Sequence, residues 1–388
     1  MEGLQFQLEK DKPAKLQYYW YIIIIRRKDF NLNKTFAMLI SFLLVFLFII
    51  PISDANAAGS STVTTKIYSY KGQKYVQIIG GEQKVIDKIN KTLKIHAVNA
   101  AIQNTYLKKQ QDYFYWNTTA QTKYNQNNLL SIVYTDYNFR GGAHGYEEVT
   151  TYNYDLTTGK RLYLNQVVQT NKQAVNLAEG IESDLKSNEN VFPESFYNFP
   201  LSNTSSFYYQ NTGIVMVFNP YEVGPYAAGF IEVKVPFSKI QSELSRPFFD
   251  LNKNSIQELK SGRIPGFENI SFGQTKAEVS KALKSSDREP YYEPEMGGLF
   301  WIFEGVEYAS FNFGEGDTDR LNHIYLSWKT LPMKTFSDIE KILGKGQKGV
   351  NPDIQEEYLL SYRFGDTRVH FASNSTEGII HGITISHY

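Results

Sequence analysis

Two rounds of strand-like and helix-like patterns follow one another along the first two-thirds of the chain. Residues 60–80 alternate between apolar and polar side chains, which predicts one or two half-buried strands. Apolar residues then recur at helical spacing from Val85 to about Leu107, with lysines on the outside, so we expect an amphipathic helix packed on the sheet. Alternation returns in residues 112–124 and 129–139, which predicts two further strands.

The second round begins after a glycine-rich segment, Arg140–Tyr146. Residues 149–154 and 161–164 read as a hairpin whose turn places Gly159 in a left-handed conformation. A helix is expected over residues 166–185, then a loop over 192–209, and two last strands over 213–218 and 229–235. Together the two rounds predict an α+β fold of antiparallel sheets with packed helices.

The last third of the chain reads as a linker followed by two similar copies. Residues 246–264 are rich in Pro, Gly and Asn, which is typical of a linker, with a short helix over 256–260. Beyond it the sequence resembles itself at a spacing of roughly sixty residues. The aligned segments are Thr275–Leu283 with Thr335–Leu343, and Leu321–Ser327 with Ile380–Ser386. The pattern of each copy predicts a short helix with an N-terminal cap, a loop and three strands.

The N-terminal residues have the features of an export signal. An apolar run over residues 36–52 follows Arg26, Arg27, Lys28 and Lys34 and precedes an Ala-x-Ala site. We expect export, with cleavage after Ala57, and translation that begins near Leu32. An uncleaved signal anchor is the alternative, because the run approaches spanning length. A mature protein in the medium that begins near Ala58 would exclude an anchor.

These patterns divide the chain into five parts, the last of which has two copies. The predicted parts are a leader (1–57), an N-terminal α+β subdomain (58–135), a second α+β subdomain (136–245), a linker (246–264) and a tandem-repeat domain (265–388) made of residues 265–329 and 330–388.

Composition narrows the choice of function. The chain has 40 basic and 40 acidic residues without a basic stripe, so the sequence does not indicate a nucleic-acid partner. It has no cysteine, so disulfides and thiol chemistry are excluded. It has 28 tyrosines, whose apolar rings and polar tips suit half-buried strands or a recognition surface.

The titratable residues suggest no catalytic or metal site. His144 lies in the glycine-rich segment, but no second histidine or carboxylate stands at ligand spacing, so it reads as a residue that satisfies the turn. His370, His381 and His387 could converge on adjacent strands, yet ordinary strand histidines explain them better. Two acidic stretches, Glu315–Asp319 and Glu293–Glu295, read as a hairpin turn and a solvated loop. We therefore expect no cofactor and no enzyme activity.

Aromatic residues crowd the first C-terminal copy. Because neighbouring residues of a strand face opposite sides, half of these aromatics must belong to the core. If the outer face carries Trp301 and Phe303, it is a candidate recognition surface.

Three motifs resemble those of a known family. They are Gly141–His144, Asn153–Leu156 with Thr158–Lys160, and Asn219–Glu222 with Pro225–Gly229. In this order they resemble the paired extracytoplasmic domains of RsiV-type anti-sigma factors and of PdaC-type peptidoglycan deacetylases, over about residues 63–240. The resemblance implies a non-catalytic module that senses a lysozyme-like protein. The sigma-binding segment and the deacetylase motif are not recognisable, so it implies the module without either effector.

The C-terminal copies resemble a second fold. The run Phe272–Val279 and the duplicated helix-then-strands pattern are similar to the tandem-repeat domain of the β-lactamase inhibitor protein. That resemblance implies a curved sheet that binds a partner.

The sequence thus predicts an exported binding protein of a Gram-positive-type cell envelope. We expect its partner to be a lysozyme-like or other wall-active enzyme, or peptidoglycan, and we expect membrane association only if the leader is uncleaved. The alternatives are a signal-anchored sensor and an envelope hydrolase with an unfamiliar site. The candidate ligand-binding residues are Arg140, His144, Tyr146, Pro220, Tyr221, Tyr226, Trp301 and Phe303.

Overall fold

The protein is described by a computed structural model that covers residues 63–243, 247–288, 290–293, 298–314 and 319–387. The predicted leader, its apolar run and its cleavage site lie outside these residues. Among the described residues, no helix is both long enough and apolar enough to cross a membrane.

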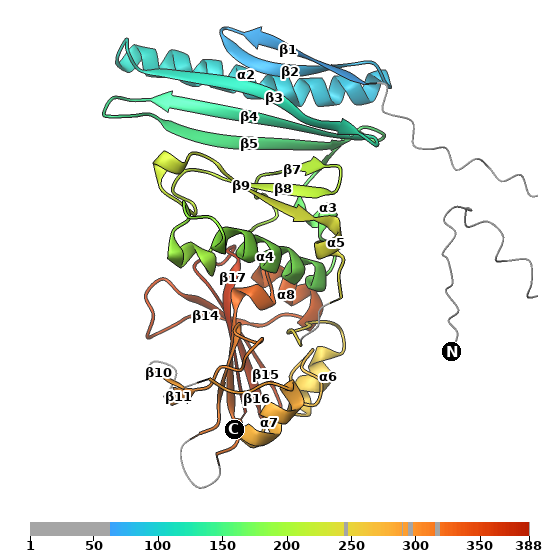
Figure 1. Cartoon of the computed structure of the whole chain (residues 1–388), viewed down its shortest axis with the longest axis vertical. Coiled ribbons are helices and arrows are strands. Elements are labelled where there is room, and N and C mark those ends of the chain that lie inside the picture. Colours follow the sequence, from blue (N-terminus) through green and yellow to red (C-terminus); the bar gives the residue numbers. More distant parts are fainter. Residues whose placement is uncertain (1–62, 244–246, 289, 294–297, 315–318, 388) are drawn as a thin grey trace, which may run out of the picture. The chain divides into compact units, whose positions relative to one another are not determined.

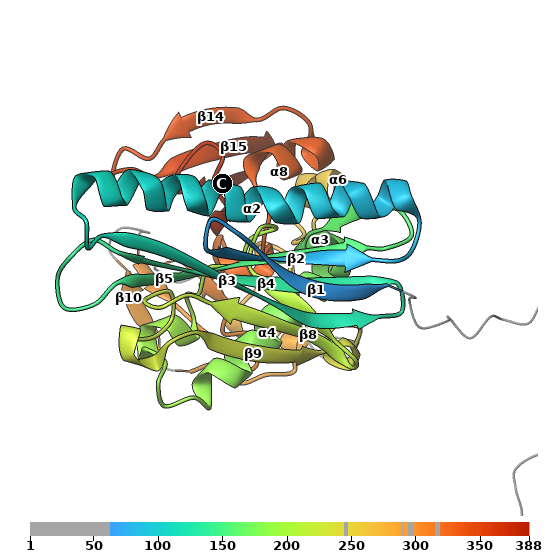
Figure 2. The same cartoon turned by 90° about the horizontal axis from the view of Figure 1, so that it is seen from above.

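The first layers of the fold are a long helix and two antiparallel sheets (Figures 1 and 2). A hairpin of β1 and β2 precedes helix α2, and a four-stranded sheet of order β3-β4-β5-β6 follows it. The bounds are β1 Thr64–Tyr70, β2 Gln73–Ile79, α2 Gln83–Gln110, β3 Tyr115–Gln126, β4 Leu129–Phe139, β5 Tyr146–Asp155 and β6 Lys160–Leu162.

Helix α2 packs on this sheet through an apolar stripe. Ile89, Leu93 and Ala97 recur at helical spacing and are fully buried. They belong to the same core as Leu130 and Ile132 of β4. Burying a large apolar side chain contributes about 1.5–3 kcal/mol, so this stripe holds the helix on the sheet.

A three-stranded sheet of order β7-β8-β9 and its helices form the next layers (Figure 1). The bounds are α3 Leu164–Val167, α4 Asn171–Lys186, η1 Pro193–Phe196, β7 Phe207–Gln210, β8 Gly213–Phe218, η2 Tyr226–Ala228, β9 Ile231–Pro236 and α5 Phe237–Ile240. The helix predicted over residues 166–185 is two helices, because Thr170 caps α4 together with Gln173 and starts a new helix there. The predicted loop over 192–209 contains η1 and β7.

The predicted boundary between residues 135 and 136 is wrong. It falls inside β4, and β4 pairs with both β3 and β5 along most of its length. One continuous sheet therefore spans the two predicted subdomains.

Amide and hydroxyl side chains, rather than ladder hydrogen bonds, join neighbouring sheets. Asn153 Nδ2 on β5 donates to Phe207 O of β7 (2.8 Å), and Phe207 N donates to Thr151 Oγ1 (3.1 Å). Ser131 Oγ on β4 accepts from Tyr209 N (3.0 Å) and donates to Asn153 Oδ1 (2.6 Å). All three side chains are buried, so they satisfy backbone groups of β7 that water cannot reach.

The same device recurs at the β1–β2 hairpin. Gln73 Nε2 donates to Trp116 O (3.0 Å) and its Oε1 accepts from Thr118 N (2.7 Å), so one amide pairs with β3 as a strand residue would. On the same strand, Ile78 exchanges two hydrogen bonds with Asn90 of α2, at 2.7 and 3.0 Å. These side chains fix β2 between the helix and the sheet.

The C-terminal part has one six-stranded sheet of order β12-β13-β17-β16-β15-β14 and a hairpin of β10 and β11. The bounds are α6 Ser255–Lys260, α7 Lys276–Leu283, β10 Tyr291–Glu293, β11 Gly298–Phe300, β12 Ala309–Asn312, β13 His323–Ser327, η4 Trp328–Thr330, α8 Phe336–Leu343, β14 Gln347–Val350, β15 Tyr358–Phe364, β16 Thr367–Ser373 and β17 Ile380–His387. The α+β class predicted from the sequence is confirmed.

The aligned C-terminal segments lie side by side. β13 and β17 pair antiparallel, and Tyr325 lies opposite Thr384, the residue with which it aligns in sequence. Both α7 and α8 begin with a capping box, formed by Thr275 and by Thr335. A pair of copies related by a two-fold axis would have this arrangement; the tandem repeat itself stays a prediction.

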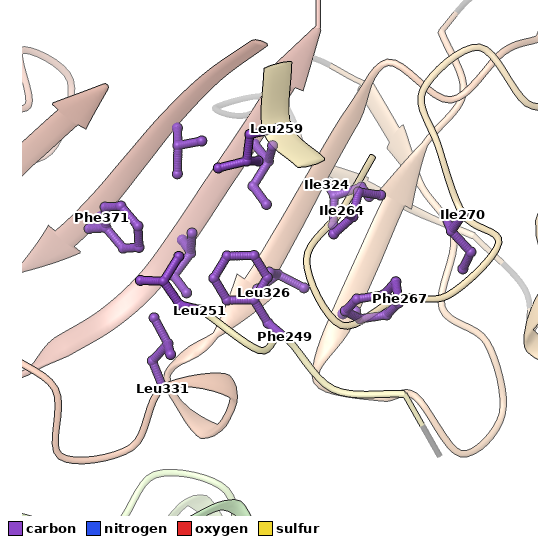
Figure 3. Close-up of a cluster of buried hydrophobic side chains, with 14 of the residues drawn as sticks. Phe249, Leu251, Leu259, Ile264, Phe267, Ile270, Ile324, Leu326, Leu331 and Phe371 are labelled. Carbon is purple, nitrogen blue, oxygen red and sulfur yellow. The ribbon is translucent and has the colours of Figure 1, made fainter. Parts of the chain in front are cut away.

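The linker predicted over residues 246–264 is wrong for its described part, residues 247–264. Phe249, Leu251, Leu259 and Ile264 from this segment are buried in the C-terminal core with Phe371 of β16 (Figure 3). The segment was misassigned because its turn-forming residues dominate the pattern, whereas its apolar residues are few and four of them are buried.

We predict that Asn153→Ala destabilises the protein by about 2–4 kcal/mol, because it leaves the carbonyl of Phe207 without its donor and the hydroxyl proton of Ser131 without its acceptor, and each such buried group costs about 1–3 kcal/mol. Urea unfolding measures this change. The control is Asn117→Ala at an exposed position of β3, for which about 0.5 kcal/mol or less is expected. Equal losses in the two variants would contradict the assigned role of Asn153.

Candidate binding surface

The glycine-rich segment is the turn between β4 and β5. Gly141 and Gly142 have φ values of 88° and 92°, which favour glycine. Gly145 is buried, and a side chain there would come within 2.5 Å of Asn138 O. Its N–H donates to the hydroxyl of Tyr137 (3.0 Å). The glycines therefore let the chain fold tightly against β4, and the turn presents His144 and Tyr146 to solvent.

The loop after β8 is built by Asn219 and Glu222. Asn219 Oδ1 accepts from Val149 N of β5 (2.8 Å), and its own N–H donates to Glu222 Oε2 (2.6 Å). Tyr221 adopts a left-handed conformation (φ 72°), and its N–H donates to Gly224 O (2.9 Å). Pro220 is buried, so it shapes the loop and cannot contact a ligand as the sequence predicted.

The two segments meet through aromatic rings. The rings of His144 and Tyr226 stack with centroids 4.0 Å apart and an angle of 21° between their planes. Tyr221 lies beside Tyr226 at 5.8 Å. Tyr146 and Tyr221 are 42% and 56% exposed, so large apolar area faces solvent. We call His144, Tyr146, Tyr221 and Tyr226 the tyrosine surface.

Further aromatic residues lie on β3, on β4 and just before β3, and the sequence did not predict them as candidates. Tyr115 of β3 stacks on Tyr137 of β4 at 5.6 Å, and Tyr137 in turn binds Gly145 N. Tyr113 packs edge-on against Phe114, which lies under Gly141. The sequence signal was the alternation in residues 112–124 and 129–139. If these two strands pair as a hairpin, Tyr115 lies opposite Phe139 and beside the glycine-rich turn.

Carboxylates surround the tyrosine surface. Partial burial and the carboxylates of Glu148 and Glu222 raise the pKa of Tyr146. Partial burial and Glu147 likewise raise the pKa of Tyr226. Both hydroxyls therefore stay protonated near neutral pH and can donate hydrogen bonds. Arg140 is exposed at the start of the turn.

The two C-terminal candidates do not form an exposed aromatic site. Phe303 is fully buried and packs edge-on against Phe311 at 5.2 Å, so the expectation that it binds a ligand is wrong. Trp301 is half-buried, and Lys276 Nζ lies 3.4 Å from the centre of its ring. The chain's own lysine thus covers that ring, and Lys276 also pairs with Asp287 (2.9 Å).

The C-terminal histidines have separate partners. His370 Nδ1 lies 2.8 Å from Ser361 Oγ, and His381 Nε2 lies 3.3 Å from Glu357 Oε1. His387 Nδ1 lies 3.0 Å from Thr367 Oγ1. Within the described ranges, no group of three or more histidines and carboxylates could hold a metal ion. Glu295, Glu315 and Asp317 lie outside those ranges.

A buried polar network lies between α2 and the sheet. His96 Nε2 is 2.9 Å from Asp136 Oδ2, and His96 Nδ1 is 3.1 Å from the hydroxyl of Tyr152. Asp136 Oδ1 accepts hydrogen bonds from Trp116 Nε1 (3.1 Å) and Thr118 Oγ1. Burial acts to raise the pKa of Asp136, but the hydrogen bond and charge of His96, with those two donors, outweigh it and lower the pKa.

The sequence of contacts from a hydroxyl through a histidine to an aspartate resembles a catalytic triad, but the burial of these residues indicates a structural role. Asp136 and Tyr152 are only 6% and 9% exposed, so a substrate cannot reach them. His96 is not among the residues that the sequence predicted to be functional. The signal was present, because His96 falls within the apolar stripe of α2, three residues after Leu93 and four before Ala100.

Two family matches cover the module, and the boundary between them falls within β5. Residues 62–147 match the family described as deacetylase PdaC, and residues 154–238 match the protein of unknown function DUF3298. The chain therefore contains a PdaC/DUF3298-like module. The glycine-rich turn belongs to the first match and the loop of Tyr221 and Tyr226 to the second, so the tyrosine surface forms where the two matches meet.

No curated protein matches the chain. A solved DUF3298 family protein from Bacteroides fragilis is 15% identical, with 47% of this chain and 93% of that chain covered and a TM-score of 0.32. One from Pseudomonas aeruginosa is 16% identical, with 46% and 91% covered and a TM-score of 0.34. A DUF4309 family protein from Bacillus subtilis is 17% identical, with 36% and 96% covered and a TM-score of 0.26.

We predict that Asp136→Asn destabilises the protein by about 1.5–3 kcal/mol near neutral pH, because it removes charged hydrogen bonds. The folded pKa of Asp136 lies below the ordinary value of 3.8, so its stabilisation is present above that value and is lost as the pH falls through the folded pKa. Urea unfolding between about pH 7 and pH 3 should show the difference between variant and wild type shrinking with acidity.

The control for this experiment is the exposed residue Asp112, changed to Asn. It should have little effect at any pH. A loss in Asp136→Asn that is the same at both ends of the pH range would contradict the assigned role of the charge.

Proposed function

We propose that the protein is a non-catalytic binding protein of the cell envelope and that the tyrosine surface recognises a wall-active protein of the lysozyme-like class. The observation that carries the proposal is the stack of His144 on Tyr226, 4.0 Å apart, because it joins two loops from separate halves of the module into one presented surface. Each loop is held by its own hydrogen bonds, so the surface is formed before any partner arrives.

The composition of the tyrosine surface suits protein recognition. Tyrosine buries a large area at a small cost in side-chain entropy, and such residues dominate the energetic centres of interfaces. Tyr221 and Tyr146 are 56% and 42% exposed, so their rings are available to a partner. Their hydroxyls can also donate to a partner's polar groups.

The charge beside the surface favours a cationic protein over a neutral glycan as the partner. Glu147, Glu148 and Glu222 lie close enough to influence Tyr226 and Tyr146. Complementary charge raises association rates and aligns the partner. Direct binding of peptidoglycan is the competing outcome. A secreted protein and a signal-anchored sensor would use the same surface.

A binding role also agrees with the state of the histidines. His144 is stacked on Tyr226, and its Nδ1 lies 2.7 Å from Gly145 O, which fixes the ring as part of the turn. His96, the histidine closest to a carboxylate in this module, is committed to Asp136 and Tyr152 in the interior. Neither arrangement offers a free base next to a substrate-sized opening.

We predict that Tyr221→Ala and Tyr226→Ala each weaken binding of a purified lysozyme-class hydrolase at least tenfold, which corresponds to about 1.4 kcal/mol of lost contact energy. Titration calorimetry measures the affinity, and co-sedimentation with peptidoglycan is measured in parallel. Tyr68→Ala is the matched control, since Tyr68 is 40% exposed on β1. Unchanged affinity in both surface variants, or binding of peptidoglycan alone, would overturn the proposal.

A further inference from the structure

The open edge of β5 carries a second feature, a small polar cavity. β6 pairs only with Asn153, Tyr154 and Asp155, so among the described strands none continues along the rest of this edge of β5. Side chains occupy it instead: Asn219 Oδ1 accepts from Val149 N, and Ser206 Oγ donates to Val149 O (3.2 Å). Between these contacts and the segment 200–206 lies a cavity of about 320 Å³.

Hydroxyl groups dominate the lining of this cavity. Thr150 of β5 faces it, and Ser202, Thr204 and Ser205 contribute hydroxyls from the facing segment. The segment is held in place by its own hydrogen bonds, because Ser202 N donates to Ser205 Oγ (2.8 Å) and Leu164 N donates to Asn203 O (3.2 Å). Ser202 Oγ also lies 3.0 Å from Thr204 Oγ1, so the hydroxyls are held in place by one another. Each hydroxyl has one donor and two acceptor sites, which leaves capacity for a ligand.

Arg161 supplies a cation with unused hydrogen-bonding capacity. Its guanidinium lies 4.3 Å from the centre of the Tyr152 ring, and its Nη2 donates to Thr151 O (3.0 Å). Its Nε is buried and donates to no acceptor in the described part of the chain. Arg161 lines the cavity, and its guanidinium carries five N–H donors, so donors beyond the one given to Thr151 O can meet a ligand oxygen there.

The charges around the cavity select the class of ligand. Glu148 and Glu222 line it, and Arg161 is the single cation in its lining. Two carboxylates disfavour an anion, whereas carboxylate acceptors, hydroxyls and guanidinium donors together suit a ligand that both donates and accepts several hydrogen bonds. The volume is at the small end of the range for ligand pockets, which limits the ligand to one or two rings.

We infer that this cavity is a binding site for a neutral sugar, with Arg161 and Glu148 as its polar anchors. The site is separate from the tyrosine surface, and it does not require that surface to bind a protein. Glu148 and Glu222 lie between the two, because both line the cavity and both influence Tyr146. The variants that separate the two sites are therefore Arg161→Met for the cavity and Tyr226→Ala for the tyrosine surface.

The test is titration of the purified chain with three probes, namely N-acetylglucosamine, glucose and glucuronic acid, followed by ligand-observed NMR and calorimetry. We expect at least one neutral sugar to bind with a Kd of about 1 mM or tighter and glucuronic acid to bind more weakly. Arg161→Met should weaken the neutral sugar at least tenfold. Glu148→Gln should weaken the neutral sugar and narrow the gap to glucuronic acid.

The controls separate binding from folding and from the first proposal. Arg161 also contacts Tyr152, so the exposed Glu148→Gln variant provides a test that does not depend on the stability of Arg161→Met. Tyr226→Ala should leave sugar binding unchanged while it weakens the protein partner. The inference is overturned if none of the probes binds, if glucuronic acid binds more tightly than both neutral sugars, or if Glu148→Gln leaves neutral-sugar affinity unchanged.

Discussion

The module depends on one physical constraint: the edge strands of separate sheets must have their buried backbone groups satisfied without a continuous ladder. Asn153, Ser131 and Thr151 meet this constraint for β7, and Gln73 meets it for β3. A side-chain amide carries the same donor and acceptor as a peptide group, so it can replace a missing strand residue. These side chains therefore fix which strand of one sheet lies beside which strand of the next, and so they fix the order of the layers in the module.

This constraint changes the meaning of the motifs. Asn153 belongs to one of the motifs that carry the family resemblance; it is 2% exposed, and its side chain bonds to neighbouring strands. Asn219 has a similar role, since it ties the loop after β8 to Val149 of β5. The motifs build a junction between two sheets, and the tyrosine surface and the polar cavity are the two features that this junction exposes.

The sequence predicted the elements better than their connections. Helix α2, the strands β3 to β5 and the capped helices α7 and α8 follow from periodicity and capping residues that act within a few positions. The pairing of His144 with Tyr226 depends on residues 82 positions apart, which periodicity cannot report. The sequence did not predict that Phe249 and Phe303 are buried, for the same reason: tertiary packing, and not the neighbours in sequence, determines their burial.

The central claim is that the tyrosine surface is where a partner docks, and site-specific crosslinking tests it most directly. A photo-reactive phenylalanine analogue is placed at position 221 in one sample and at position 68 in another, and each is irradiated with a purified lysozyme-class hydrolase. The account predicts a covalent adduct from position 221 and none from position 68. Adducts from position 68 alone, or equal yields from both positions, would contradict it.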